Sequence, residues 1–206
     1  MSTGKAAGLL LLTSFLAACS VSPPRTPDDI CGIFREKDSW YDAAKATQQR
    51  WGVPIQVPFA IMYQESAFHQ DAKAPRKYLL WVIPWGRVTT AAGYAQAKDE
   101  GWNDYRKSTG HSGASRKDFD DAIDFVGWYM DKTYTINGVS KWDAYDQYLN
   151  YHEGWGGYRQ RTYASKAWLP AVAGKVQARS QMYAQQYAGC KADLDRGFWS
   201  RLWHWL

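Results

Sequence analysis

The deciding stretch of this sequence is Phe59-Ala60-Ile61-Met62-Tyr63-Gln64-Glu65-Ser66-Ala67-Phe68-His69. Its spacing predicts one helix with an apolar inner side, on which Ile61 lies one turn before Glu65 and Phe68 about one turn after it. A carboxyl group with apolar neighbours loses hydration in its charged form, so the pKa of Glu65 should rise and suit a proton donor. The alternative is a half-exposed Glu at a helix edge, because Glu is rarely buried without a partner. This stretch alone favours that alternative.

The composition sets the limits for the rest of the chain. A length of 206 residues suits one domain with its own core plus short appendages. The 12 Trp and 14 Tyr are many for this length, and such side chains suit both a core and a sugar-binding groove. The formal net charge of +5 is spread along the chain without a block of Lys or Arg, which argues against nucleic acid as a partner.

Residues 1–18 are predicted to be a signal peptide. They carry one charge, Lys5, and an apolar run over 9–15 that is too short to span a bilayer. The closing residues Leu16-Ala17-Ala18-Cys19 resemble the lipobox of bacterial lipoproteins, which implies cleavage before Cys19 and a diacylglycerol on its thiol. Ser20 stands where Asp would signal retention at the inner membrane, so we expect the periplasmic face of the outer membrane. The alternative is an ordinary secreted protein with an accidental Cys.

Residues 19–29 contain three prolines and are predicted to be an extended, lipid-anchored tether. Once Cys19 is assigned to lipid, Cys31 and Cys190 are left, and they bracket nearly the whole folded region. An oxidising compartment favours a disulfide between them, and the alternative is two inert buried thiols.

Six helices are predicted where apolar positions recur at helical spacing. They span residues 30–51, 58–69, 93–105, 119–133, 142–152 and 165–187, and the last contains Pro170, which can break it. Residues 115–118, Ser-Arg-Lys-Asp, are typical of a helix N-cap box. No clear alternating strand run is present, so the fold is predicted to be mainly α with little or no sheet.

Two apolar segments do not fit this helical pattern. Residues 78–85 read Tyr-Leu-Leu-Trp-Val-Ile-Pro-Trp and could form core, a hairpin along a cleft or a membrane-facing loop. We favour a loop that lines a cleft, because loops on rigid scaffolds often carry binding surfaces. Residues 191–206 form a Trp-rich amphipathic tail, which either lies in a membrane interface or packs on the domain itself.

Three short motifs follow one another along the helical chain. They are Glu65-Ser66, then Gly93-Tyr94-Ala95-Gln96, then Asn150-Tyr151-His152-Glu153-Gly154-Trp155-Gly156. Their order resembles that of the soluble lytic transglycosylase (SLT) family in the goose-type lysozyme-like superfamily. The resemblance implies a single lysozyme-like catalytic domain, which we place at residues 30–190.

The same resemblance implies a chemistry. Glu65 matches the family's only catalytic acid, which protonates the β-1,4 bond between N-acetylmuramic acid and N-acetylglucosamine. The substrate's own acetamido group stabilises the cationic centre, and Glu65 then takes the C6 hydroxyl proton to give a 1,6-anhydro product. Neither a second carboxylate nor a cofactor or metal is required. The implied partner is the glycan strands of peptidoglycan. The lipobox adds the membrane through Cys19, and the tail would be a second membrane contact only in the alternative in which it lies in the interface.

The resemblance also implies which residues bind substrate. Ser66 matches a residue that orients substrate, Gln96 one that bonds the sugar, and Tyr151 a tyrosine whose hydroxyl contacts the catalytic carboxyl group. Tyr94 and His152 are expected to contact substrate as well.

Departures from the family pattern leave alternatives open. His152 replaces an Asn, Tyr94-Ala95 replaces Leu-Met, and Glu153 replaces an Ala. Glu153 is either a second carboxylate, which would favour a lysozyme-type muramidase, or a solvated helix end, which we favour. A further alternative is a non-catalytic lipoprotein that holds peptidoglycan in the same groove.

Two other kinds of site are excluded by spacing. The four histidines are scattered and give no metal-binding pair at helical spacing. Ser66 lacks the glycines that flank a serine nucleophile in a strand-to-helix turn.

Overall fold

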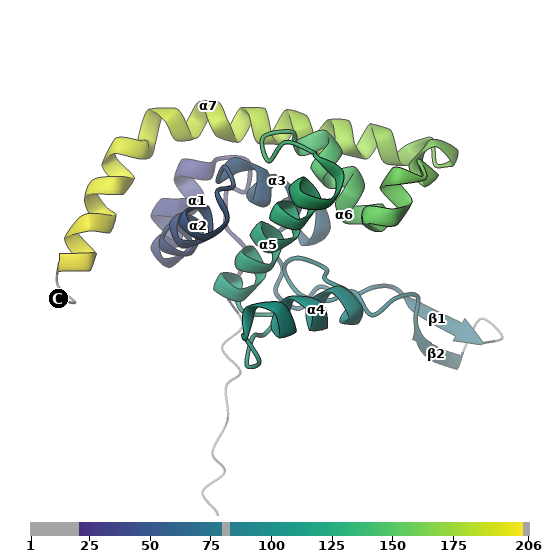
Figure 1. Cartoon of the computed structure of the whole chain (residues 1–206). Helices are drawn as coiled ribbons and strands as arrows, with labels where there is room; N and C mark the ends of the chain where they lie inside the picture. The colour runs from purple at the N-terminus through teal and green to yellow at the C-terminus, as the bar shows by residue number, and fades with distance from the viewer. Residues whose placement is uncertain (1–20, 80–82, 204–206) are drawn as a thin grey trace, which may run out of the picture.

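Helices dominate the computed structural model, which describes residues 21–79 and 83–203 (Figure 1). In chain order its elements are α1 (Ile30–Glu36), α2 (Asp38–Trp51), α3 (Gln56–Ser66), β1 (Arg76–Leu79), β2 (Ile83–Arg87), α4 (Asp99–Thr109), α5 (Phe119–Asn137), α6 (Ala144–Arg159), the 3₁₀ helix η1 (Thr162–Ser165) and α7 (Trp168–Trp203). The prediction of a mainly α fold with little sheet is confirmed. The predicted signal peptide and Cys19 lie outside the described residues.

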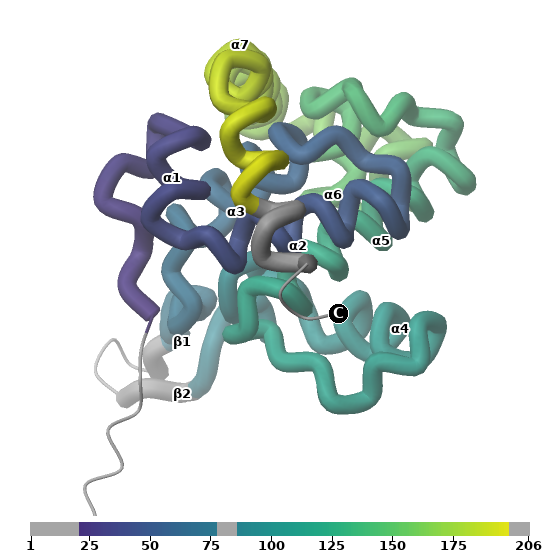
Figure 2. The backbone as a smooth tube through the Cα atoms, turned by 90° about the vertical axis from the view of Figure 1, so that its left-hand side faces the viewer, coloured from purple at the N-terminus to yellow at the C-terminus, as the bar shows by residue number. Residues whose placement is uncertain are grey.

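Helix α3 lies at the centre and contacts α5, α6 and α7. The whole run Gln56–Met62 is buried, which fits the unbroken apolar sequence of residues 57–62 in this helix. Helix α7 runs across α1, α3 and α6, and Figure 2 looks along it from one end. Helix α3 is thereby held against three helices that all come from the second half of the chain.

Several helix boundaries differ from the prediction. The predicted helix over 30–51 is two helices, because Lys37 between them has φ −126° and ψ 71°. Helix α5 is capped by Asp118, whose carboxylate accepts from two backbone N–H groups, and not by Ser115. Pro170 does not break the last helix, since this residue lies in the first turn of α7, where its missing N–H costs little.

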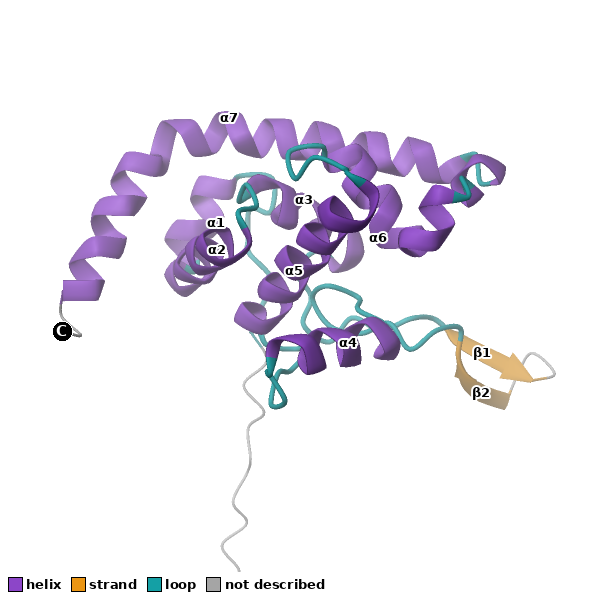
Figure 3. Cartoon of the chain, viewed as in Figure 1, coloured by secondary structure: helices purple, strands orange, loops and turns teal. Residues whose placement is uncertain are grey.

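Within the apolar segment 78–85, residues 78–79 and 83–85 lie in the two strands of an antiparallel hairpin, which was one of the expected alternatives, and not in the favoured loop. Strands β1 and β2 pair with each other, with Leu79 opposite Ile83 and Arg76 opposite Arg87. Figure 3 shows the hairpin projecting from the helices, and within the described residues it packs against none of them. The side chains of 78–85 lie outside the described part of the structure.

The N-terminal segment is held on α7. Pro24 is buried, and the carboxylate of Asp28 lies 2.6 Å from the guanidinium of Arg179. A disulfide joins Cys31 to Cys190, the pair expected from the sequence. The segment expected to be an extended tether therefore contacts the domain from Pro24 onward.

The predicted tail continues α7 as far as Trp203 and forms no separate element. Its aromatic side chains from 198 onward lie outside the described part of the structure. No helix in the described residues combines the length and apolarity needed to cross a membrane.

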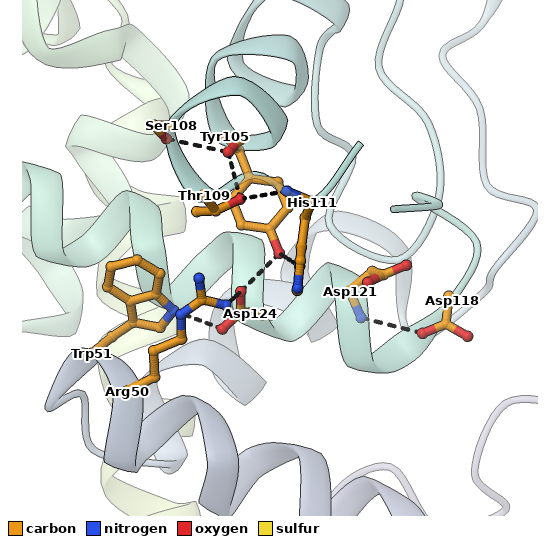
Figure 4. Close-up of polar contacts among 9 residues, drawn as sticks. All are labelled: Arg50, Trp51, Tyr105, Ser108, Thr109, His111, Asp118, Asp121 and Asp124. Carbon is orange, nitrogen blue, oxygen red and sulfur yellow. Dashed lines mark hydrogen bonds and ion pairs between the residues drawn. The ribbon is translucent and has the colours of Figure 1, made fainter. Parts of the chain in front are cut away.

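Asp124 ties α2 and α4 to α5. Its two carboxylate oxygens accept hydrogen bonds from Trp51 at 2.7 Å, Arg50 at 2.8 Å and Tyr105 at 2.7 Å (Figure 4). The Tyr105 hydroxyl also lies 3.2 Å from Nδ1 of His111, which follows α4. This network fixes α4, the helix that follows the second sequence motif.

Candidate active site

Glu65 is the next-to-last residue of α3. The helix ends one residue later because Ala67 and Phe68 adopt left-handed conformations, so the predicted helix over 58–69 is three residues too long. This end turns Phe68 into the core and leaves Glu65 partly buried. Burial raises the pKa of Glu65 to about 7, although a hydrogen bond from Tyr148 and the charge of Lys98 act in the opposite direction.

The tyrosine that forms a hydrogen bond with Glu65 is Tyr148 and not Tyr151. Tyr148 lies on α6, is 4% exposed and donates its hydroxyl to the carboxyl group of Glu65. Tyr151 donates instead to the carbonyl oxygen of Ala95 at 2.5 Å. The two tyrosines are three positions apart and so share one face of α6. Helical periodicity is the signal that could have indicated Tyr148 as well, but the motif indicated only Tyr151.

The second motif forms a turn and not the start of a helix, since α4 begins only at Asp99. Gly93 has φ +76°, and a Cβ atom there would lie 1.9 Å from the carbonyl oxygen of Arg116. Gln96 is also left-handed, with φ +46°. The backbone of this turn therefore fits closely against the segment before α5.

Ser66 and Gln96 connect this turn to its surroundings. The hydroxyl of Ser66 donates to the carbonyl oxygen of Tyr94 at 2.7 Å, which joins the end of α3 to the turn. The amide of Gln96 donates to the carbonyl oxygens of Ala72 and Gly93, both at 2.9 Å. Both side chains hold the backbone around Glu65.

Tyr94 belongs to the core. It is 1% exposed and packs edge-on against the rings of Trp40 and Phe119. The side chain expected to contact substrate is thus enclosed by other aromatic rings, and it is the carbonyl group of Tyr94 that takes part in the site.

A cavity of about 670 Å³ adjoins Glu65. Ser66 and Gln96 line it together with residues that the motifs did not indicate, namely Tyr63, Gln64, His69, Asp71, Lys73 and Pro75. The hairpin follows directly after Pro75 and so starts at the rim of this cavity. The other carboxylate in the lining, Asp71, is about half exposed and paired with Lys117, which lowers its pKa.

Glu153 is neither a solvated helix end nor a free carboxylate. Its side chain is 3% exposed and lies 2.6 Å from Nζ of Lys166 and 2.9 Å from Nδ1 of His152, and it also accepts the hydroxyl of Thr162. Burial favours the neutral form, but these partners outweigh it and lower the pKa of Glu153 to about 2. It is therefore a fixed anion that orients His152.

The site thus combines one carboxyl group of raised pKa with a cavity large enough for a sugar-sized ligand. Within the described residues no three His, Cys, Asp or Glu side chains gather in a way that would hold a metal ion.

Comparison with known proteins identifies a family. The family model described as a transglycosylase SLT domain matches residues 7–190. No curated protein matches the chain significantly.

Proposed function

Since this chain belongs to the transglycosylase SLT domain family, whose activity is that of a lyase on peptidoglycan, we propose that Glu65 is its only acid and base. In this proposal the enzyme cleaves the β-1,4 bond between N-acetylmuramic acid and N-acetylglucosamine and leaves a 1,6-anhydro end.

The observation that carries the proposal is the Glu65 carboxyl group, which is partly buried beside a sugar-sized cavity with a pKa of about 7. At neutral pH such a group is present in both protonation states, as one residue that first donates and then accepts a proton requires. Glu65 protonates the glycosidic oxygen, and the glycan's acetamido oxygen stabilises the positive charge at C1. The Glu65 carboxylate then accepts the proton of the C6 hydroxyl group as that oxygen bonds to C1.

A second carboxylate would instead favour hydrolysis, because a retaining glycosidase uses two carboxyl groups about 5–5.5 Å apart. Glu153 is held by Lys166, and Asp71 is held by Lys117. Glu153, whose side chain is 3% exposed, is therefore committed to its cationic partner, whereas Asp71 lies in a weaker, half-exposed pair. The commitment of Glu153 supports the single-acid mechanism over that of a muramidase.

The test is digestion of purified peptidoglycan by the wild type and by Glu65→Gln, with mass spectrometry of the soluble products. We expect anhydro ends from the wild type and at least a thousandfold less product from the variant, because an essential proton donor is lost. Reducing ends would establish hydrolysis instead. Equal activity of the two proteins would remove Glu65 from the mechanism, and binding without cleavage by both would favour a non-catalytic role.

We also propose that the protein is a lipoprotein, attached through Cys19 to the periplasmic face of the outer membrane. The leader and its Leu-Ala-Ala-Cys ending support this placement. Metabolic labelling with a clickable fatty acid tests it, with Cys19→Ala as the control that should remain unlabelled.

A further inference from the structure

A row of side chains leads from Glu65 to an exposed tryptophan at the start of α7. Tyr148 bonds Glu65, and its ring centroid lies 6.4 Å from that of His152, one turn further along α6. The His152 ring lies 5.1 Å from the ring of Trp168 and at 81° to it. The end of α6 and the start of α7 lie at the end of the molecule away from the C-terminus (Figure 1). The row therefore extends from the acid toward the outside.

Trp168 presents its ring to solvent. It is 53% exposed, although Trp is a large apolar side chain that is usually well buried. The His152 ring is nearly perpendicular to the indole of Trp168, so the His152 ring can cover at most one face of that indole. An open indole face that is linked to Glu65 through His152 and Tyr148 suits the apolar face of a sugar ring, since aromatic rings supply contact area at a small entropic cost.

His152 adds a defined hydrogen-bonding group to this face. The Glu153 carboxylate can only accept, so Nδ1 of His152 carries a proton and donates to it over 2.9 Å. In the neutral ring Nε2 then has a free lone pair, and no described residue donates to it. The His152 side chain is 33% exposed, so a hydroxyl or amide N–H group of a ligand can reach part of the ring.

We propose that Trp168 and His152 form a subsite for a sugar residue of the glycan strand, one that lies beyond the pair of sugars joined by the cleaved bond. The indole of Trp168 stacks on the sugar ring, and Nε2 of His152 accepts a hydrogen bond from it. Glu153, Lys166 and Thr162 are positioning residues that fix the His152 tautomer. This inference rests on the proposed function, because it requires a glycan at Glu65.

The test measures binding of peptide-free glycan strands by isothermal titration calorimetry in the Glu65→Gln background, in which strands are not cleaved. We expect Trp168→Ala to weaken binding about tenfold, as loss of an aromatic anchor does. Trp168→Phe keeps a ring and should recover most of this loss. The matched control is Trp142→Ala, because Trp142 is also exposed, at 67%, but lies before the opposite end of α6. The glycan affinity of this control variant should stay within about twofold of that of the Glu65→Gln background.

His152 is tested in the same assay. His152→Ala should weaken binding by a smaller factor than Trp168→Ala, and His152→Gln, which keeps an acceptor, should recover part of that loss. Equal losses in the Ala and Gln variants would overturn the role of Nε2.

Two further outcomes separate this inference from the function it rests on. If Trp168→Ala binds glycan as the Trp142→Ala variant does, or loses affinity only for strands that carry peptides, the sugar subsite is wrong while the enzyme still cleaves. If the wild type releases no soluble product from peptidoglycan, the proposed function fails and the subsite fails with it.

Discussion

The hydroxyl group of Tyr148 donates a hydrogen bond to the carboxyl group of Glu65 and so joins α6 to the C-terminal end of α3. A phenol donates a stronger hydrogen bond to a charged carboxylate than to a neutral carboxylic acid. Tyr148 therefore lowers the pKa of Glu65, which burial raises. The pKa of about 7 is the balance of these effects. Tyr148 thus keeps Glu65 able to work in both protonation states near neutral pH.

Replacing Tyr148 by Phe should raise the pKa of Glu65, because the variant keeps the burial and removes the hydrogen bond. Cleavage needs the protonated acid and falls as pH rises through this pKa, so the alkaline limb of the activity profile should move to higher pH. The check is kcat/KM for soluble glycan strands measured from pH 5 to 9. An alkaline limb that stays in place or moves to lower pH would contradict the assignment of Tyr148.

Lys98 provides the comparison for that measurement. Its charge also lowers the pKa of Glu65, but its side chain is exposed. Lys98→Met should therefore shift the alkaline limb in the same direction, and the shift should shrink in 0.5 M salt, where charges about 5 Å or more apart are screened. The shift caused by Tyr148→Phe should be independent of salt.

Replacing Glu65 by Gln should stabilise the protein at alkaline pH. The folded-state pKa of about 7 lies above the ordinary value of 4.5, so the carboxyl group costs no stability below pH 4.5 and costs progressively more as pH rises to about 7. Each pKa unit corresponds to about 1.4 kcal/mol, so the gain at pH 8 should reach about 3 kcal/mol. Urea unfolding of both proteins at pH 4 and pH 8 measures it. A variant that is no more stable than the wild type at pH 8 would show that Glu65 is not destabilised by burial.

The helices could be predicted because their apolar positions repeat regularly, whereas their ends depended on single residues. Lys37 divides α1 from α2, and Ala67 ends α3, although neither is Gly or Pro. Phe68 supplies the reason for the second case, since burial of its ring outweighs the cost of a left-handed backbone. Such tertiary effects leave no periodic signal in a sequence.

For the site, the motifs indicated Glu65 but not the geometry of its partners. Tyr148 and Tyr151 lie on the same helix face, and only tertiary packing decides which hydroxyl meets the carboxyl group. Glu153 was assigned to solvent because Glu is usually exposed, yet Lys166 lies 13 positions further along the chain and neutralises it. Pairing between charges on different elements could not be derived from spacing along one helix.

Replacing Gly93 by Ala should destabilise the protein by at least about 3 kcal/mol, because the new Cβ atom would meet the carbonyl oxygen of Arg116 at 1.9 Å. The matched control is Gly110→Ala, since Gly110 has nearly the same φ of +75° but nothing within 4 Å of a Cβ atom. That change should cost only the strain of the left-handed backbone, about 1–2 kcal/mol. Thermal unfolding of both variants checks this, and equal losses would mean that the turn does not fit closely against Arg116.

Replacing Asp124 by Asn should lower the free energy of unfolding by about 2–3 kcal/mol. The amide cannot serve Arg50, Trp51 and Tyr105 as the carboxylate does, and the buried Tyr105 hydroxyl would lose a charged acceptor. Asp71→Asn is the control, because Asp71 and Lys117 are both more than half exposed and their ion pair should be worth less than about 1 kcal/mol. Urea unfolding at pH 7 compares the two variants. If Asp124→Asn lowers the free energy of unfolding no more than Asp71→Asn does, then apolar contacts alone hold α4 on α5. In that case the turn before α4 does not depend on the Asp124 hydrogen bonds.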